Sequence, residues 1–274
     1  MSNTLFAPLD EQWEPTRATL HAYAKGVGAI ARAHAVFHPK WWHISLKVRP
    51  NGLVTDNLPL PGGGSVALRM DLVGDSVVIE ASDGTSSSVP MSDGLTGTEF
   101  ADALIAAVAE YGLESDYLRE KFVDETPREY DPRAATALMT VFVNANTVLE
   151  RRRATLGDSV GPVQVWPHGF DLAFEWFGTR VERYEEAGEV QAHPAQLNFG
   201  LYPAGRAYFY SNPWPFEGEA LLGVALPHGA EWHTEGWEGS MLNYDEVAGD
   251  AAAADLILEY FGAVYAAAAP TLMV

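Results

Sequence analysis

Three histidines lie within two residues of a tryptophan, and their side chains could bind a metal. His43 stands in WWH, His168 in VWPHGFDLAFEW and His233 in EWH. Neutral imidazole is a common ligand of divalent metals, and Asp171 or Glu235 would serve as a fourth ligand. No two of the chain's eight histidines have the spacing of a known metal motif, so the alternative is that each of the three is structural.

The run VWPHGFDLAFEW also holds two carboxylates. If it forms a strand, Asp171 and Glu175 share one face and lie about 13 Å apart at ~3.3 Å per residue. That separation excludes a shared proton or a common metal on this strand alone. His168, between Pro167 and Gly169, is expected at a bent strand entrance, where its ring would bond Asp171 or face a pocket.

Two later segments are rich in aromatic residues, AYFYSNPWPF at 207–216 and EWHTEGWEG at 231–239. Aromatic side chains line ligand pockets and stack on planar groups or sugars, but they also fill ordinary cores. The pattern favours core packing, and the alternative is an aromatic-lined pocket for a small molecule. The predicted ligand-binding residues are Trp42, Trp166, His168, Asp171, Tyr208, Tyr210, Trp214 and Trp232.

The composition and the absence of known motifs exclude or disfavour several other classes of function. The chain has no cysteine, which rules out thiolate catalysis and cysteine-ligated zinc, and its formal net charge of −20 disfavours nucleic acid and anionic membranes as partners. No phosphate-binding loop, dinucleotide fingerprint or nucleophile elbow is present, so no motif indicates a reaction. The N-terminal segment lacks a secretory pattern and the apolar runs are short, so a soluble cytoplasmic protein is expected.

The first half shows a helix, several strands and a second helix. Apolar residues at three- and four-residue spacing predict a helix from Thr16 to about Ala35, weakened by two internal glycines. Alternation predicts a strand in WWHISLKV (41–48) and a hairpin over 65–84. Thr96 followed by Glu99 is typical of a capping box that starts the second helix. A turn at 50–52, a loop at 58–64 and one more short strand near 85–91 complete the predicted elements of this half.

The second half predicts the same order. Asp131-Pro132 is typical of a helix start, and the helix would end at the basic run 151–153. A strand in FDLAFEWF, a hairpin turning near Ala204-Gly205 and a short strand in GSMLNYDE follow, and Asp250 is expected to cap a last helix.

These elements predict an α+β fold of two diverged repeats, each helix, antiparallel strands and helix, packed as one compact body. The predicted halves are residues 1–112 and 131–274, joined by a charged linker at 113–130. The alternative is coincidence, because strands followed by helices are common in α+β proteins.

Several motifs together resemble a bacterial family of unknown function with WWH, WPHxFD and WHTEG-like motifs in this order. The resemblance covers about residues 13–265 and implies one continuous module in a soluble bacterial protein, with no established activity. Its residues are TLHAY (19–23), WWHISLKV (41–48), GLVT (52–55), VVIEASDG (77–84), VQVWPHGFDLA (163–173), YFYSNPWP (208–215) and WHTEGW (232–237).

Three function classes follow. The favoured one is a protein that binds a small molecule in an aromatic-lined pocket, with or without metal-free catalysis. The second is a metal-dependent enzyme that uses His43, His168 and His233 with a divalent metal. The third is a protein–protein interaction module, which predicts a contiguous exposed apolar patch of more than a few hundred Å².

Overall fold

The computed structural model describes residues 4–9, 13–186 and 188–274, which form two compact units. Unit 2 contains described residues of 9–143 and 164–171, and unit 1 contains those of 1–8, 144–163 and 172–274. Helix α3 (Pro132–Arg153) supplies residues to both units, and 164–171 belongs to unit 2. The division into halves at 1–112 and 131–274 stays a prediction.

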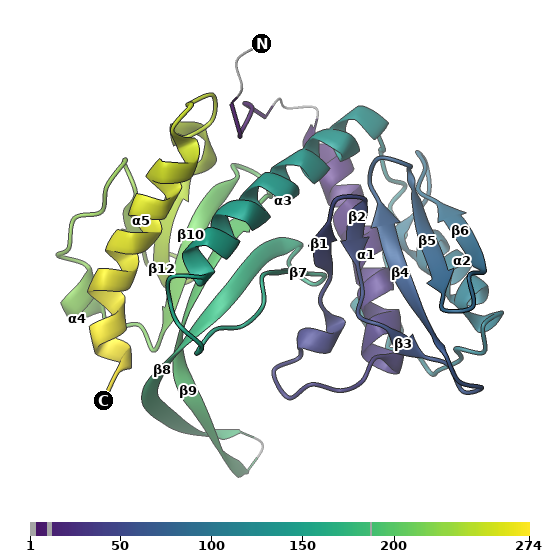
Figure 1. The fold of residues 1–274 in the computed structure, drawn as a ribbon, viewed down its shortest axis with the longest axis horizontal. Helices are drawn as coiled ribbons and strands as arrows, with labels where there is room; N and C mark the ends of the chain where they lie inside the picture. Colours follow the sequence, from purple (N-terminus) through teal and green to yellow (C-terminus); the bar gives the residue numbers. More distant parts are fainter. Residues whose placement is uncertain (1–3, 10–12, 187) are drawn as a thin grey trace. The chain divides into compact units, whose positions relative to one another are not determined.

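Unit 2 is built on an antiparallel sheet with strand order β1-β2-β4-β5-β6, in which β3 also pairs with β4 (Figure 1). The predicted hairpin is confirmed as β4 and β5, where alternate residues such as Leu68 and Ile79 are fully buried. The elements are α1 Trp13–His34, β1 Lys47–Arg49, β2 Gly52–Val54, β3 Leu58–Pro59, β4 Ser65–Asp71, β5 Ser76–Ala81, β6 Ser86–Pro90, α2 Gly97–Ala109 and β7 Gln164–Trp166.

Helix α1 packs closely on helix α2 through its small residues. Gly26 lies so near α2 that an ideal Cβ there would stand 3.0 Å from the Cβ of Ala101. One turn away, the rings of Tyr23 and Phe100 stack at 4.0 Å. The glycine that weakens the helix in sequence terms therefore permits the helix pair. The predicted capping box at the start of α2 is also confirmed.

The predicted strand at 41–48 is wrong for most of its length. Residues 42–44 form a single 3-10 turn, and the chain is extended only from Ser45 onward, into β1. The reason lies in the backbone before the turn, where Trp41 adopts a left-handed conformation with φ of 60°. The Oγ atom of Ser45 then lies 2.6 Å from the carbonyl oxygen of Trp42, which closes the turn. The loop predicted at 58–64 begins as strand β3.

Segment 113–130, predicted as a charged linker, lies within unit 2. Phe122 is buried, and Tyr130 donates from its hydroxyl to Asp75 at 2.8 Å. Asp131 follows the segment, its Oδ1 accepts from the backbone N–H of Arg133 at 2.8 Å, and α3 begins at Pro132 as predicted.

Unit 1 contains the strands β11-β12-β10-β9-β8 in that order, covered by helix α5 (Figure 1). Phe261 of α5 packs on Phe199 and Phe209 with ring centroids 5.3 and 6.4 Å apart. Asp250 accepts a backbone hydrogen bond from Ala252, but α5 itself begins only at Ala253. The elements are β8 Asp171–Glu186, β9 Glu189–Tyr202, β10 Tyr208–Trp214, α4 Gly218–Leu221, β11 Glu231–His233, β12 Gly239–Asn243 and α5 Ala253–Ala268.

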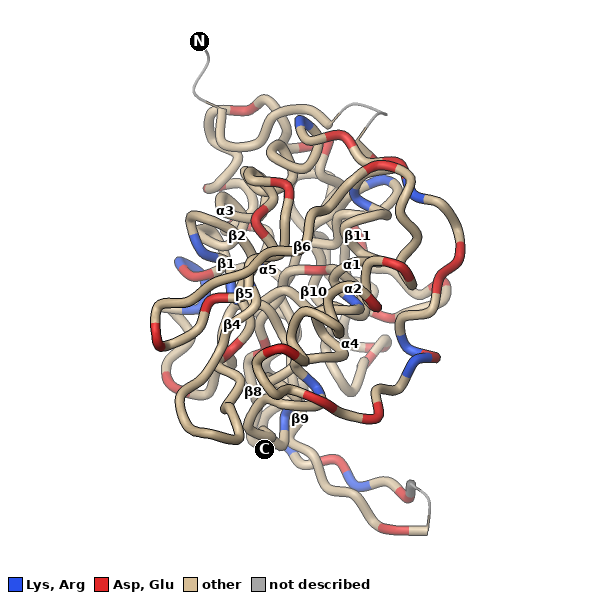
Figure 2. Tube along the Cα trace, turned by 90° about the vertical axis from the view of Figure 1, so that its right-hand side faces the viewer, with Lys and Arg blue, Asp and Glu red and all other residues tan. Residues whose placement is uncertain are grey.

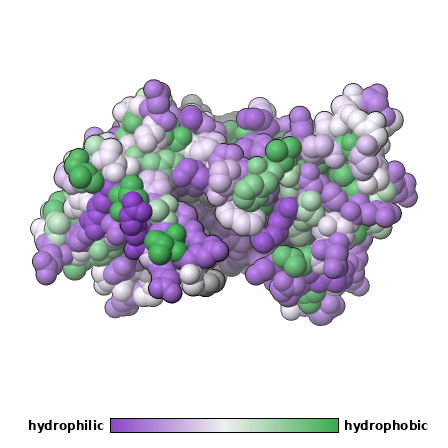
Figure 3. Space-filling model, turned by 90° about the horizontal axis from the view of Figure 1, so that it is seen from below, coloured by the Kyte–Doolittle hydropathy of each residue, from purple (hydrophilic) through white to green (hydrophobic). Residues whose placement is uncertain are grey.

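Strands β8 and β9 continue past the rest of their sheet as a two-stranded ribbon (Figure 1). Figure 2 shows Asp and Glu distributed along much of the trace, with fewer Lys and Arg. On the face in Figure 3, hydrophobic residues form small separate patches within a mainly hydrophilic surface. No helix among the described residues is both long and apolar enough to cross a membrane.

The structure confirms the α+β fold class, with helices and antiparallel sheets. The proposed duplication of the two halves stays a prediction.

Candidate functional site

The WPHGF run forms a tight turn between β7 and β8. The carbonyl oxygen of Trp166 accepts from the backbone N–H groups of Gly169 and Phe170 at 3.2 and 2.6 Å. Phe170 takes a left-handed conformation with φ of 57° and is fully buried. The predicted bent strand entrance is therefore a closed turn in which Pro167 is buried and His168 is exposed.

Helix α1 holds this turn through His21. Its Nε2 donates to the carbonyl oxygen of His168 at 2.9 Å, and its ring lies parallel to Phe170 with centroids 5.9 Å apart. Burial lowers the pKa of His21 to about 4, partly offset by the bond to the carbonyl, while the charges of Lys25 and Arg17 lower it further. His21 is therefore neutral at neutral pH.

A pocket of about 130 Å³ lies where α1, the 118–121 segment and this turn meet in unit 2. Gly28 allows the approach, because an ideal Cβ at this position would stand 2.7 Å from the Cβ of Pro167. A water molecule needs about 10–15 Å³ by the same kind of measure, so the pocket has room for a small organic molecule. Its lining residues are Lys25, Gly28, Ala29, Arg32, Ile44, Leu118, Lys121, Pro167 and His168.

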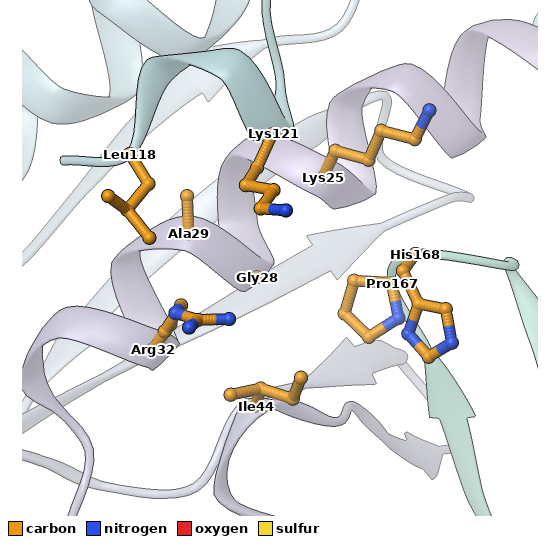
Figure 4. Close-up of a pocket in the computed structure, with 9 residues that line it drawn as sticks. All are labelled: Lys25, Gly28, Ala29, Arg32, Ile44, Leu118, Lys121, Pro167 and His168. Atoms are coloured by element: carbon orange, nitrogen blue, oxygen red, sulfur yellow. The ribbon is translucent and has the colours of Figure 1, made fainter. Parts of the chain in front are cut away.

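The pocket lining combines an apolar floor with three cationic side chains. Two of the chain's four lysines, Lys25 and Lys121, line it together with Arg32. Lys121 and Arg32 extend toward the space in front of Gly28, whereas Lys25 points away along α1 (Figure 4). None of the three cations forms a salt bridge with any residue that the structure describes. In a chain with 37 acidic residues, such a gathering of unneutralised cations favours an anionic ligand.

An aromatic cluster, defined here as Phe37, Trp41 and His43, adjoins the pocket. The Arg32 guanidinium lies over the Trp41 ring at 4.6 Å from its centroid. The ring of Phe37 is 5.8 Å from Trp41 and 5.3 Å from His43. His43 immediately precedes Ile44 of the pocket floor, so cluster and pocket share one 3-10 turn.

The other predicted residues of unit 2 lie around the same turns. Trp42 stacks on His38 at 4.4 Å, and its buried indole N–H has no hydrogen-bond partner in the described part of the chain. The ring of Trp166 lies 5.9 Å from that of His168. The Asp171 carboxylate lies beside Gly169, where an ideal Cβ would stand 2.6 Å from its Oδ1.

Of the predicted aromatic residues of unit 1, Tyr208 and Tyr210 lie together, whereas Trp214 and Trp232 have other partners. Tyr208 and Tyr210 of β10 have their rings 6.0 and 6.3 Å from Trp237, a residue that the prediction missed. Trp214 meets Tyr184 at 6.1 Å. The indole of Trp232 donates to the carbonyl oxygen of Val224 at 2.9 Å.

The histidine cluster has no support in the described residues, where no three His, Asp or Glu side chains could hold one metal ion. His43 is buried and its Nδ1 accepts from the backbone N–H of His38 at 3.2 Å. His233 donates from Nε2 to the carbonyl oxygen of Glu235 at 2.7 Å. Both rings have structural contacts, and burial lowers the pKa of His43.

Comparison with known proteins places the chain in a family. A family model with the description "Family of unknown function (DUF5996)" matches residues 8–273. The chain belongs to this family. No curated protein and no solved structure matches the chain.

In this DUF5996 chain, sequence reasoning found His168 but missed the cations beside it. A signal was present, because Lys25 and Arg32 are seven residues apart on a predicted helix and therefore share a face. Gly28 stands between them on that face. Nothing in the sequence connected Lys121 to them, since it lies in the segment predicted to be a linker.

A second pocket of unit 2, of about 300 Å³, is polar and acidic. Two of its three carboxylates already serve the fold: Asp93 accepts from the backbone of Tyr130 at 3.0 Å, and Asp131 caps α3. This pocket lies between α1 and the start of α3. Because these carboxylates already hold the fold, it is a weaker candidate for a ligand site than the first pocket.

Proposed function

We propose that the chain binds a small organic anion in the pocket beside His168. The observation that carries the proposal is the set of three lining cations, Lys25, Arg32 and Lys121, without salt bridges to described residues. Two of them, Arg32 and Lys121, extend into the space over the apolar floor (Figure 4). Ligand sites typically combine an apolar lining with a few polar groups that fix orientation. A carboxylate or phosphate would meet Arg32 and Lys121, while its apolar part would lie on Ile44 and Leu118.

The lining supports binding more than acid–base or nucleophilic catalysis. Its nine residues include no carboxylate, hydroxyl or thiol, so His168 has no partner in the lining for a nucleophile–base pair. The predicted small-molecule function is kept, but the proposed pocket is lined by cationic and aliphatic side chains, with His168 as the predicted member. An aromatic-lined site around Tyr208 and Tyr210 stays a prediction.

Three probes of similar size and different charge test the proposal: benzoate, benzyl alcohol and benzylammonium. We expect benzoate to bind at least about tenfold more tightly than benzylammonium, because one cation–anion contact near a surface contributes on the order of 1 kcal/mol or more. Chemical-shift titration by NMR would give each Kd and show whether Ala29 and Leu118 respond. Equal affinity for the three probes would contradict an anion site.

Variants locate the site. Arg32→Gln and Lys121→Gln should each weaken benzoate binding, while benzyl alcohol binding changes little. Arg49→Gln is the matched control, since Arg49 is an exposed cation of the same unit outside the pocket lining. Loss of benzoate binding in the Arg49 variant as well would mean that net charge, rather than the pocket, attracts the anion.

A further inference from the structure

The surface beside the pocket is apolar and exposed, which is unusual for this acidic chain. Val36 is 73% exposed, Phe37 65% and Trp41 41%, and these residues lie in the segment between α1 and the 3-10 turn at 42–44. Leu118 of the pocket lining is 44% exposed. The segment that carries Leu118 is fixed near the end of α1, because His34 Nε2 bonds the Tyr117 hydroxyl at 2.8 Å.

Arg32 connects this surface to the pocket. Its guanidinium lines the pocket and also lies over the face of Trp41, and Trp41 in turn contacts Phe37. An anion bound to Arg32 would therefore have an exposed aromatic surface directly beside it. Because apolar area removed from water stabilises a complex in proportion to its size, an apolar chain laid on this surface would bind more tightly than a short anion.

We propose that the ligand is a single-chain anionic amphiphile, such as a fatty carboxylate, whose head group meets Arg32 and Lys121 and whose chain leaves the pocket across Trp41 and Phe37. This inference rests on the proposed function and adds the chemistry of the ligand's apolar part. The net charge of the chain indicates whether the ligand is a free amphiphile or a lipid in a membrane. A net charge of −20 is repelled by an anionic bilayer, whereas a single soluble anion reaches the local cations.

A series of linear carboxylates from hexanoate to dodecanoate, kept below their micellar concentrations, tests the inference by calorimetry. Hexanoate measures the pocket alone. We expect Kd to fall by up to about fourfold for each added methylene, the factor for full burial, until the exposed apolar surface is covered. A Kd that stays constant from hexanoate to dodecanoate would overturn the amphiphile while leaving the anion pocket in place. Failure of every carboxylate to bind would overturn both proposals.

The double variant Val36→Ser/Phe37→Ser shows where the chain lies. Both side chains are largely exposed, so the fold is expected to remain intact. Hexanoate should bind as in the wild type, and the gain for dodecanoate should fall at least about tenfold. Val190→Ser is the matched control, because Val190 is 72% exposed on β9. An unchanged gain in the double variant would overturn the proposed path.

Vesicles test the source of the amphiphile. The wild-type chain should remain in the supernatant with phosphatidylglycerol vesicles and with phosphatidylcholine vesicles. Sedimentation with the anionic vesicles alone, together with no binding of free dodecanoate, would overturn the proposal in favour of a lipid head group.

Discussion

The Nε2 atom of His21 donates to the carbonyl oxygen of His168 across 2.9 Å, so helix α1 fixes the turn that carries the pocket's histidine. The same helix supplies Lys25, Gly28 and Arg32 to the pocket. Helix α1 therefore forms one wall of the pocket and also anchors the turn that forms the opposite wall. This keeps the distance between the two walls constant.

The His21 anchor should make the fold sensitive to acid. The pKa of His21 is about 4 in the folded chain and near 6.5 when unfolded, so between these values the unfolded state binds more protons. Stability from this group is complete above pH 6.5 and is lost as the pH falls toward 4, by at most about 1.4 kcal/mol per pH unit. Urea unfolding at pH 7 and pH 5 would measure the loss.

The variant His21→Gln isolates this contribution. Glutamine does not titrate and can still donate to the His168 carbonyl, so the difference in stability between pH 7 and pH 5 should shrink. His193→Gln, at an exposed histidine of β9, serves as the control and should leave the difference unchanged. If His21→Gln retained the full pH dependence, His34 and His43, whose pKa values burial also lowers, would be the responsible groups.

Gly28 is expected to resist substitution. Alanine would favour the helix by about 1 kcal/mol, but its Cβ would overlap the rigid Pro167 ring, and overpacking costs about 1–3 kcal/mol. We therefore expect Gly28→Ala to lower the free energy of unfolding by up to about 2 kcal/mol and to weaken benzoate binding. Gly262→Ala in α5 is the control, because no described atom outside the local backbone of α5 lies within 4 Å of its ideal Cβ, and it should raise stability by about 0.5–1 kcal/mol. A stabilised Gly28→Ala protein would show that Pro167 can move.

Local signals in the sequence predicted much of the fold. The Thr96–Glu99 capping box and the Asp131-Pro132 helix start are confirmed because each depends on residues close in the chain. The strand predicted at 41–48 failed for the opposite reason. Its alternating pattern was real, but the left-handed Trp41 and the bond from Ser45 turn the backbone.

The pocket was less accessible to prediction because its parts are distant in the chain. Lys25 and Lys121 are brought together by packing of the 113–130 segment, whose charged composition suggested a linker. Pro167 reaches Gly28 from a strand that is held by two backbone hydrogen bonds of 2.8 Å between Leu46 and Val165. Neither contact produces a residue pattern that can be recognised in a single sequence.

The contact between β7 and the 45–47 segment depends on a buried polar group, the side chain of Gln164. Its Oε1 accepts from Lys47 Nζ at 2.8 Å and lies 2.5 Å from Ser45 Oγ. Gln164→Leu should lower the free energy of unfolding by about 1–3 kcal/mol, because the acceptor is lost in a buried place. Gln164→Glu keeps the acceptor and places a carboxylate beside the ammonium, so it should cost less than half as much. Chemical denaturation of both variants would decide, and an equal loss would mean that shape matters here more than hydrogen bonding.

The ribbon of β8 and β9 should be the least protected paired segment of unit 1. Residues 181–186 pair only with 189–194, whereas 196–202 lie between β8 and β10. A two-stranded ribbon is marginally stable in water, so its amides should exchange with solvent about a hundredfold or more faster than those of 197–201. Arg180 marks the boundary, because it bonds Glu217 at 2.6 Å and the carbonyl oxygen of Thr271 at 3.1 Å. Hydrogen exchange followed by mass spectrometry measures both segments in one experiment. Equal protection that disappears on dilution would contradict a free ribbon and would show that a second copy of the chain covers Val181 and Val190, which are exposed here.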